Sequence, residues 1–122
     1  MMNPTVVSQP DGSVTGLGSG GSERIRSAML ATLLRLVDLH EDAPTAIGAP
    51  RIHASDNDIQ LEPGWASDVV AALETVVPVN MWSQRNLFFG GVHAVTRHGD
   101  GSVTAVADAR RDGAVAVVPP RE

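Results

Sequence analysis

A glycine-rich stretch at residues 16–21, Gly-Leu-Gly-Ser-Gly-Gly, is the first feature with a chemical interpretation. It matches the dinucleotide pattern G-x-G-x-x-G, with a strand-like segment before it and a helix-like segment after it. Backbone N–H groups at such a turn point outward, and glycine permits positive φ there. The turn therefore suits an anion: a pyrophosphate, or the oxyanion that develops on a carbonyl during acyl transfer. A tight turn that merely requires glycine is the alternative without chemistry.

The residues around this turn argue against a nucleotide. A dinucleotide-binding fold needs the helix to lead into a parallel second strand that ends in an acidic residue. Residues 39–44, Leu-His-Glu-Asp-Ala-Pro, are instead polar and broken by proline, and the segments before the turn indicate an antiparallel hairpin. A P-loop is excluded because the chain contains no lysine. The oxyanion site and the purely structural turn remain.

Composition limits the class of protein. The chain has 122 residues, 43% of them hydrophobic and 19% charged, which is typical of one folded domain. The net charge of −5 argues against nucleic acid or an anionic membrane as partner. The absence of cysteine excludes disulfides, thiolate metal sites and a cysteine nucleophile. The sequence shows no signal-like segment and no apolar run of about 18 residues, so a cytoplasmic location is expected if the chain is expressed as it stands.

Hydrophobic patterning predicts an α+β chain with strands at both ends and two main helices between them. A β-hairpin is expected at residues 5–17 around Pro10-Asp11-Gly12, followed by a helix from Ser22, as N-cap, to Leu39. The apolar side chains of this helix occupy all but a narrow stripe, so cover on more than one side is expected. The remaining predicted elements are a short helical turn within 40–49, strands at 51–53 and 59–62, a helix from Ser67 to Val77, strands at 88–98 and 102–108 joined through Gly99-Asp100-Gly101, and a last strand at 114–118.

The four histidines predict no metal site. His53 is expected to be a structural residue, hydrogen-bonded within a strand. His93 and His98 are five residues apart on one predicted strand, so they point to opposite faces. His40 is expected at the end of a helix, where a partly positive side chain suits the helix dipole.

For other charged and aromatic residues, a structural role is favoured over ligand binding. Arg110, Arg111 and Asp112 could bind a substrate carboxylate, but a solvated or ion-paired turn is favoured. Trp65 and Trp82 are expected to anchor the core or an interface rather than to stack on a ligand.

Five segments share a pattern in the same order along nearly the whole chain. They read M-N-P-T-V-V at 2–7, G-S-G-G-S-E-R-I at 18–25, A-P-R-I-H at 49–53, F-G-G-V-H-A-V at 89–95 and A-D-A-R-R-D-G-A at 107–114. Together they resemble the C-terminal part of the small subunit of γ-glutamyltransferase, also called glutathione hydrolase, an N-terminal-nucleophile hydrolase. The resemblance implies part of a four-layer αββα sandwich with mainly antiparallel strands. Ala109 stands where the family has proline, and Glu23 is an extra residue in the turn.

The resemblance also implies a role for the glycine turn. In the family, a Gly-Gly pair donates backbone N–H groups to the tetrahedral intermediate of γ-glutamyl transfer. The matching residues are Gly20 and Gly21; an alignment on Arg24-Ile25 shifts the pair to Gly21 and Ser22, so Ser22 is the alternate donor. The implied activity is γ-glutamyl transfer from, or hydrolysis of, glutathione and related compounds, and no cofactor is expected.

The family's nucleophile has no counterpart in residues 1–122. It is a threonine at the new N-terminus of the small subunit, released by self-cleavage upstream of the M-S-P-T strand, where a serine pair also binds the donor. Thr5 matches the strand threonine and is not expected to be the nucleophile. The chain is therefore expected to be the C-terminal portion of a small-subunit-like domain, inactive alone. It would bind a γ-glutamyl substrate only beside a protein partner, either the large-subunit or upstream segment or a second copy. The alternative is a degenerate fold module without activity that acts in interaction or dimerisation.

Overall fold

An N-terminal and a C-terminal hairpin pair with each other in one antiparallel sheet. The computed structural model describes residues 2–118. The sheet contains β1 (Thr5–Ser8), β2 (Val14–Ser19), β6 (Val92–Arg97) and β7 (Val103–Val106), in the order β1-β2-β6-β7. The pairing of β2 with β6 joins the N-terminal hairpin to the C-terminal one, and both hairpins confirm the predicted ones.

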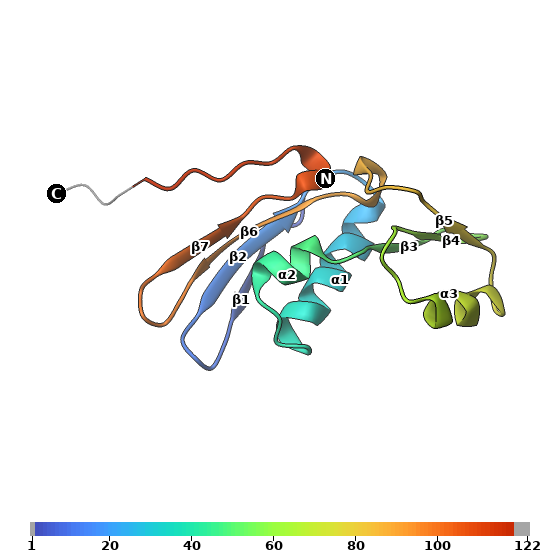
Figure 1. The fold of residues 1–122 in the computed structure, drawn as a ribbon. Helices are drawn as coiled ribbons and strands as arrows, with labels where there is room; N and C mark the ends of the chain where they lie inside the picture. Colours follow the sequence, from blue (N-terminus) through green and yellow to red (C-terminus); the bar gives the residue numbers. More distant parts are fainter. Residues whose placement is uncertain (1, 119–122) are drawn as a thin grey trace.

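Two helices cover one face of this sheet. Figure 1 shows α1 (Arg24–Val37) and α2 (Ala43–Gly48) packed together against it. Side chains of β6 alternate, so that Val92 and Ala94 are buried beneath the helices while His93 and Val95 point to the opposite face. The core is made of Leu17, Ile25, Ala28, Met29, Leu36, Ala43, Ala46, Ile47, Val92 and Ala94.

The opposite face of the sheet carries no second layer within the described residues. Val6, Val95 and Val103 are exposed there, beside Gly16 and Ala105 in the ladder. We call this surface the bare sheet face. The chain thus forms one helix layer and one sheet layer, which is half of the predicted four-layer sandwich.

A second, smaller sheet lies beyond the N-terminal half of α1 (Figure 1). It contains β3 (Ile52–Ala54), β4 (Ile59–Leu61) and β5 (Val79–Met81), with β3 antiparallel and β5 parallel to β4. The crossover from β4 to β5 contains α3 (Ser67–Glu74), because a parallel pair needs a long connection. The α+β class with mainly antiparallel strands is confirmed, although three helices form and β5 was not predicted.

Several predicted boundaries are wrong. The first long helix starts at Arg24 with Glu23 at the N-cap position and no side-chain cap hydrogen bond, whereas Ser22 was predicted as the N-cap. It ends at Val37, so His40 lies outside the helix, with φ +52°. The helix expected over 67–77 ends at residue 74, and 114–118 form no strand, since this segment pairs with none of the described strands.

The first helix, α1, packs on the main sheet, on α2 and on β3, and still has an uncovered apolar surface. Ile25, Ala28 and Met29 are buried against the sheet. Leu30 and Leu34 are 61% and 46% exposed, and Val37 is exposed as well. The predicted cover on more than one side is thus present in part, and these exposed apolar side chains mark the part of the helix that the described residues leave uncovered.

Candidate functional site

The glycine turn joins β2 to α1 and lies beside the beginning of the chain. Gly20 forms an isolated antiparallel bridge with Met2, and the Asn3 N–H donates to the carbonyl of Ser19 at 3.1 Å. Gly21 has φ +139°, where other residues are strained. A Cβ added at Gly20 would meet no atom within 4 Å. The backbone conformation therefore requires glycine at position 21. At position 20 it does not, and the space that a side chain would occupy is open.

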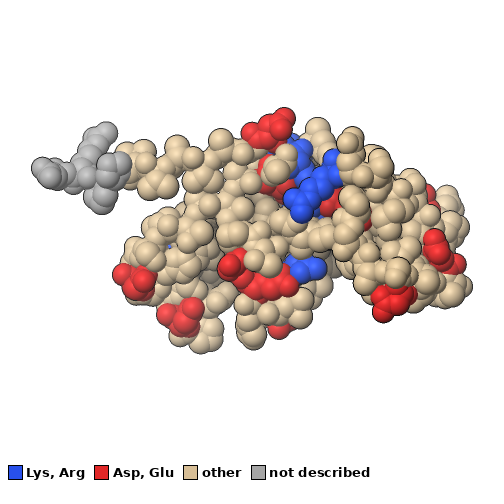
Figure 2. All heavy atoms as spheres, viewed as in Figure 1, with Lys and Arg blue, Asp and Glu red and all other residues tan. Residues whose placement is uncertain are grey.

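One arginine side chain reaches this turn from the other end of the chain. Arg111 lies in η2 (Ala109–Arg111), and its Nη2 donates a hydrogen bond to the carbonyl oxygen of Gly20. Its aliphatic stem lies across Gly91, where an added Cβ would be only 2.7 Å from both Cγ and Cδ. Figure 2 shows basic side chains near η2 on the face viewed, with acidic side chains close beside them.

Behind the turn, four charged side chains form what we call the buried charge cluster: Arg51, Glu62, Asp108 and Arg110. Arg110 donates from Nε to Glu62 at 2.7 Å and from Nη1 to Asp108 at 3.2 Å. Arg51 donates from Nη2 to Asp108 at 2.8 Å. All four side chains are at most 3% exposed. Two cations and two anions make the cluster neutral, which offsets part of the cost of burying charge.

Backbone groups complete the partners of this cluster. Asp108 accepts hydrogen bonds from the N–H groups of Val92 and Arg110, both at 2.9 Å. Arg110 also donates to the carbonyls of Ile47 and Ala49. Burial alone would raise the pKa of Asp108, but the two N–H donors and the two guanidinium groups outweigh it, so its pKa lies below the ordinary value. The cluster ties η2 to β6 and to the end of α2.

Only part of this arrangement was predicted from the sequence. The interpretation of residues 110–112 as an ion-paired turn rather than a carboxylate site is confirmed for Arg110. The four-charge cluster was missed, since its partners are 48 and 57 residues apart. A partial signal was available, because Arg51, Asp108 and Arg110 lie within segments that carry the family resemblance.

The histidines occupy separate structural positions. His53 on β3 hydrogen-bonds through Nδ1 to the Ser27 hydroxyl at 2.8 Å, and burial and the positive Arg24 lower its pKa. Nδ1 of His93 accepts from the Asp108 N–H at 3.3 Å, whereas His98 bonds to the Thr104 hydroxyl, on the helix-covered face. Within residues 2–118, no group of three or more His, Cys, Asp or Glu is placed to hold a metal ion.

Both tryptophans are half-buried and contact other residues of the same chain. Trp82 stacks on Phe88 with ring centroids 4.9 Å apart and donates to Gln60 at 2.8 Å. Trp65 donates to the carbonyl of Arg51 at 3.3 Å, so it braces the backbone of a cluster residue. No helix in the described part of the chain is long and apolar enough to cross a membrane.

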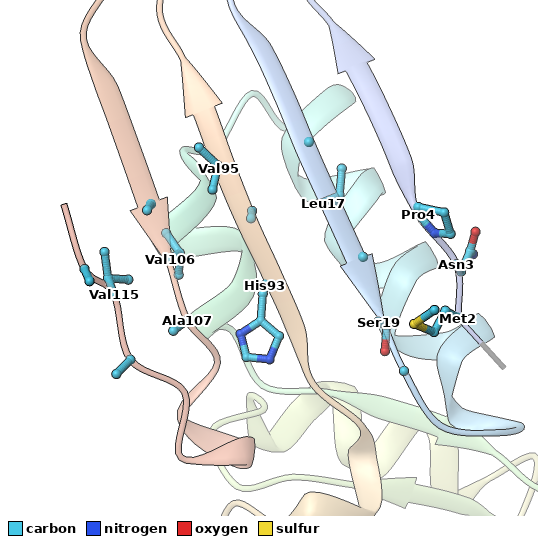
Figure 3. A pocket seen from close by; sticks show the side chains of 17 residues that line it. Met2, Asn3, Pro4, Leu17, Ser19, His93, Val95, Val106, Ala107 and Val115 are labelled. Atoms are coloured by element: carbon cyan, nitrogen blue, oxygen red, sulfur yellow. The ribbon is translucent and has the colours of Figure 1, made fainter. Parts of the chain in front are cut away.

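A groove runs over the bare sheet face and ends at the glycine turn. Figure 3 shows Met2, Asn3 and Pro4 along one side of it, Val115 along the other, and His93 and Val95 on its floor. Ser19 and Gly20 line its end. The groove is mostly apolar, and the turn is where backbone polar groups border it.

Thr5 does not lie beside the turn. It pairs with Leu17 on β2, three ladder positions from the bridge between Met2 and Gly20. Three residues of strand correspond to roughly 10 Å. Its side chain also shares the helix-covered face with Leu17, as expected for a strand threonine. The structure places Gly20, Gly21 and Ser22 together in the turn, and their role as oxyanion donors stays a prediction.

Comparisons with known proteins agree with this geometry. A family model described as Gamma-glutamyltranspeptidase matches residues 1–118. The glutathione hydrolase proenzyme of Bacillus subtilis (strain 168) is 28% identical over 115 residues, which are 93% of this chain and 19% of that protein. The chain therefore spans less than a fifth of the length of this curated relative.

Solved structures give the same answer for the fold. The Bacillus anthracis transpeptidase enzyme CapD is similar with a TM-score of 0.81 and 28% identity, over 96% of this chain and 70% of that chain. Gamma-glutamyltranspeptidase from Pseudomonas nitroreducens, complexed with L-DON, has a TM-score of 0.77 at 22% identity, over 97% and 62% of the two chains. The second likeness concerns the fold alone. Both confirm the predicted fold class.

Proposed function

We propose, from the premise that this chain belongs to the gamma-glutamyltranspeptidase family, that it supplies the oxyanion-stabilising turn of an enzyme acting on γ-glutamyl groups. The observation that carries the proposal is the turn itself. It places two consecutive glycines, the second at φ +139°, where a strand passes into a helix. Backbone N–H groups at such a turn are one kind of donor that can stabilise a developing oxyanion.

The chemistry follows from where charge develops. When a nucleophile attacks the γ-glutamyl carbonyl, the carbonyl oxygen becomes an oxyanion, and fixed N–H donors stabilise it more than the ground state. Gly20 is anchored by its bridge to Met2, so its backbone is held rather than mobile. The open space where a Cβ of Gly20 would lie lets an acyl group approach. Gly20 and Gly21 are the proposed donors. In the alternate register the donor pair is Gly21 and Ser22.

The nucleophile comes from outside residues 1–122 in this proposal. Thr5, at roughly 10 Å along the ladder, is too far from the turn to attack a carbonyl held there. An upstream segment that begins with a threonine would supply both nucleophile and base. The substrate class, glutathione and related γ-glutamyl compounds, is proposed from the name of the Bacillus subtilis relative.

The bare sheet face is the proposed contact for that segment. Its floor combines exposed Val6 and Val95 with Gly16, Gly18 and Ala105, which lack bulk. Small residues allow a second sheet to approach to the usual distance of about 10 Å. The chain covers only 19% of its curated relative, which is consistent with a missing partner segment.

Release of p-nitroaniline from γ-glutamyl-p-nitroanilide tests the function. The chain is purified alone and together with a co-expressed upstream segment that carries the threonine. Activity only in the combined sample supports the proposal, and replacement of the upstream threonine by alanine should abolish it. A Thr5→Val variant is the matched control in this chain and should stay active. Activity of the chain alone would make Thr5 or another hydroxyl the suspect, and inactivity of both samples would favour a module without catalysis.

A charge on the bare sheet face tests the partner contact. Val95→Arg should prevent co-purification with the upstream segment while the chain itself stays folded, because residue 95 is 53% exposed in the chain. Val76→Arg is the control, since Val76 is 83% exposed beyond the end of α3. Equal co-purification of both variants would show that the partner, if any, contacts another surface.

A further inference from the structure

The segment at residues 114–118, Ala-Val-Ala-Val-Val, has the composition of a strand but no strand beside it. Figure 1 shows it running out from η2 in an extended course. Within the described residues, none of its backbone N–H or C=O groups makes a hydrogen bond. Unpaired N–H and C=O groups along an extended, β-branched segment are a template on which another strand can add.

Close packing fixes the point from which this segment leaves the fold. Gly113 donates its N–H to the Asp108 carbonyl at 3.2 Å. A Cβ at Gly113 would lie 2.7 Å from Cε1 of His93 and 2.9 Å from Cβ of Ala107, so only glycine lets the backbone come this near. The side chain of His93 belongs to the bare sheet face. The segment therefore starts over this face, on which the described residues place no second layer.

The segment also forms one wall of the groove over the bare sheet face. Ala114, Val115 and Ala116 line the groove, and Figure 3 shows Val115 across it from the N-terminal residues. Farther along, Val117 and Val118 are exposed although both are apolar. Apolar side chains in water beside an uncovered apolar face mark a surface that another layer covers.

We propose that residues 114–118 become a strand of a covering sheet, packed on the bare sheet face, by hydrogen-bonding edge to edge with a strand of the upstream segment. The inference rests on the proposed function and specifies its partner contact: main-chain pairing along 114–118, in addition to side-chain packing on the bare sheet face. Strand addition of this kind gives affinity through main-chain hydrogen bonds. The chain spans 19% of its curated relative, so a protein of that length has ample further sequence to supply the pairing strand.

Hydrogen exchange of the backbone amides tests the pairing directly. Exchange is measured by mass spectrometry with residue-level fragmentation, on the chain alone and on the chain co-purified with the upstream segment. In the chain alone, residues 114–118 should exchange at close to the unprotected rate, because their N–H groups have no partner. In the assembly, at least alternate amides should slow by about 10-fold or more, since successive N–H groups of a strand point to opposite edges.

Proline substitutions separate pairing from simple coverage by the partner. Proline has no N–H, so Val115→Pro and Ala116→Pro each remove one donor, on opposite edges of the segment. At least one of them should raise the apparent Kd of the assembly by about 10-fold, measured by native mass spectrometry on dilution. Val115→Ile and Ala116→Ser keep the N–H, and these matched controls should stay within about threefold. Circular dichroism of the chain alone should be unchanged in all four variants, because the segment makes no hydrogen bond there.

The outcomes separate this inference from the proposed function. An assembly that forms but releases no p-nitroaniline would overturn the proposed activity, and hydrogen exchange would still decide the pairing. An assembly in which 114–118 stays unprotected, or in which both proline variants keep the wild-type Kd, would overturn this inference alone. Failure of the wild-type chain to assemble would overturn the partner contact and this inference together. Protection of 114–118 in the chain alone, with the mass of a dimer, would show that a second copy pairs there and would overturn the assignment to the upstream segment.

Discussion

The buried charge cluster and the glycine turn are neighbours through η2, and they obtain their polarity from opposite sources. In the cluster, Arg51, Glu62, Asp108 and Arg110 are at most 3% exposed, and each is matched by an opposite charge. In the turn, Gly20 and Gly21 contribute only backbone. The charged side chains of the cluster are buried, whereas the glycines of the turn contribute backbone groups without formal charge.

The difference predicts how substitutions in the two regions will act. A buried charge whose partner is removed is costly, so substitutions in the cluster should act on stability first. Substitutions in an exposed turn leave few buried contacts unsatisfied, so they should act through backbone conformation. Arg111 connects the two regions, with its backbone on Asp108 and its side chain on Gly20.

Asp108→Asn should give the largest effect. The side chain accepts from Arg51, Arg110 and two backbone N–H groups, and an amide would turn a donor toward some of them. We expect the free energy of unfolding to fall by about 3–5 kcal/mol, measured by urea denaturation. Glu41→Gln, which breaks the half-buried surface pair with Arg35, is the control and should cost about 0–1 kcal/mol. Similar losses in both variants would remove the contrast between the cluster and ordinary ion pairs.

Alanine at each glycine of the turn should give the next largest effect. Gly21→Ala forces a side chain onto φ +139° and should cost about 1–3 kcal/mol of stability. Gly20→Ala meets no atom within 4 Å and no positive φ, so it should stay within about 0.5 kcal/mol of the wild type. The pair differs by one position and so serves as its own control. A larger loss at Gly20 would contradict the assignment of the conformational requirement to Gly21.

Much of the fold could be predicted because it depends on local pattern. The turn signals at Pro10-Asp11-Gly12 and Gly99-Asp100-Gly101 mark two hairpins that the structure contains. The first long helix follows from its run of apolar residues. By contrast, β5 has only three residues, too few for alternation to be detected, and its parallel partner is set by the crossover.

The candidate site was also predictable only where it depends on local sequence. Two glycines before a helix are visible as a turn in any sequence, so Gly20 and Gly21 could be selected. The bond from Arg111 to Gly20 spans 91 residues, and the bond from Arg51 to Asp108 spans 57. Nothing local specifies such pairs, because they depend on how two sheets are brought together. The pattern at 114–118 predicted a strand that does not form, for the same reason: a strand also needs a hydrogen-bonded partner, which the local sequence does not specify.

The acid limb of the stability curve should depend partly on Asp108. Its pKa in the folded chain lies below the ordinary value, because N–H donors and guanidinium groups outweigh the effect of burial. The stabilisation is therefore fully present above the unfolded pKa, about 3.9, and is lost as pH falls through the folded pKa. Unfolding at several pH values, with ¹³C titration of the carboxyl, measures both quantities. Asp11→Asn is the control, since Asp11 also has a lowered pKa but is exposed, and this variant should keep most of the acid limb.

His53 should give the smallest effect, in a different pH range. Burial, followed by the positive charge of Arg24, lowers its pKa from 6.5, and Glu23 and Asp58 oppose this only partly. The folded state therefore favours the neutral ring. Its contribution is complete above the unfolded pKa and declines as pH falls through 6.5 toward the folded pKa. His53→Gln removes this titration while leaving a hydrogen-bonding side chain near Ser27, so the decline between pH 7.5 and 5 should be shallower in the variant. The ¹H titration of the His53 ring in the wild type checks the sign independently. A ring pKa above 6.5 would mean that the negative charges of Glu23 and Asp58 outweigh burial and the positive charge of Arg24 at His53. The folded state would then favour the charged ring, and the neutral polar character assigned to this position on β3 would be wrong.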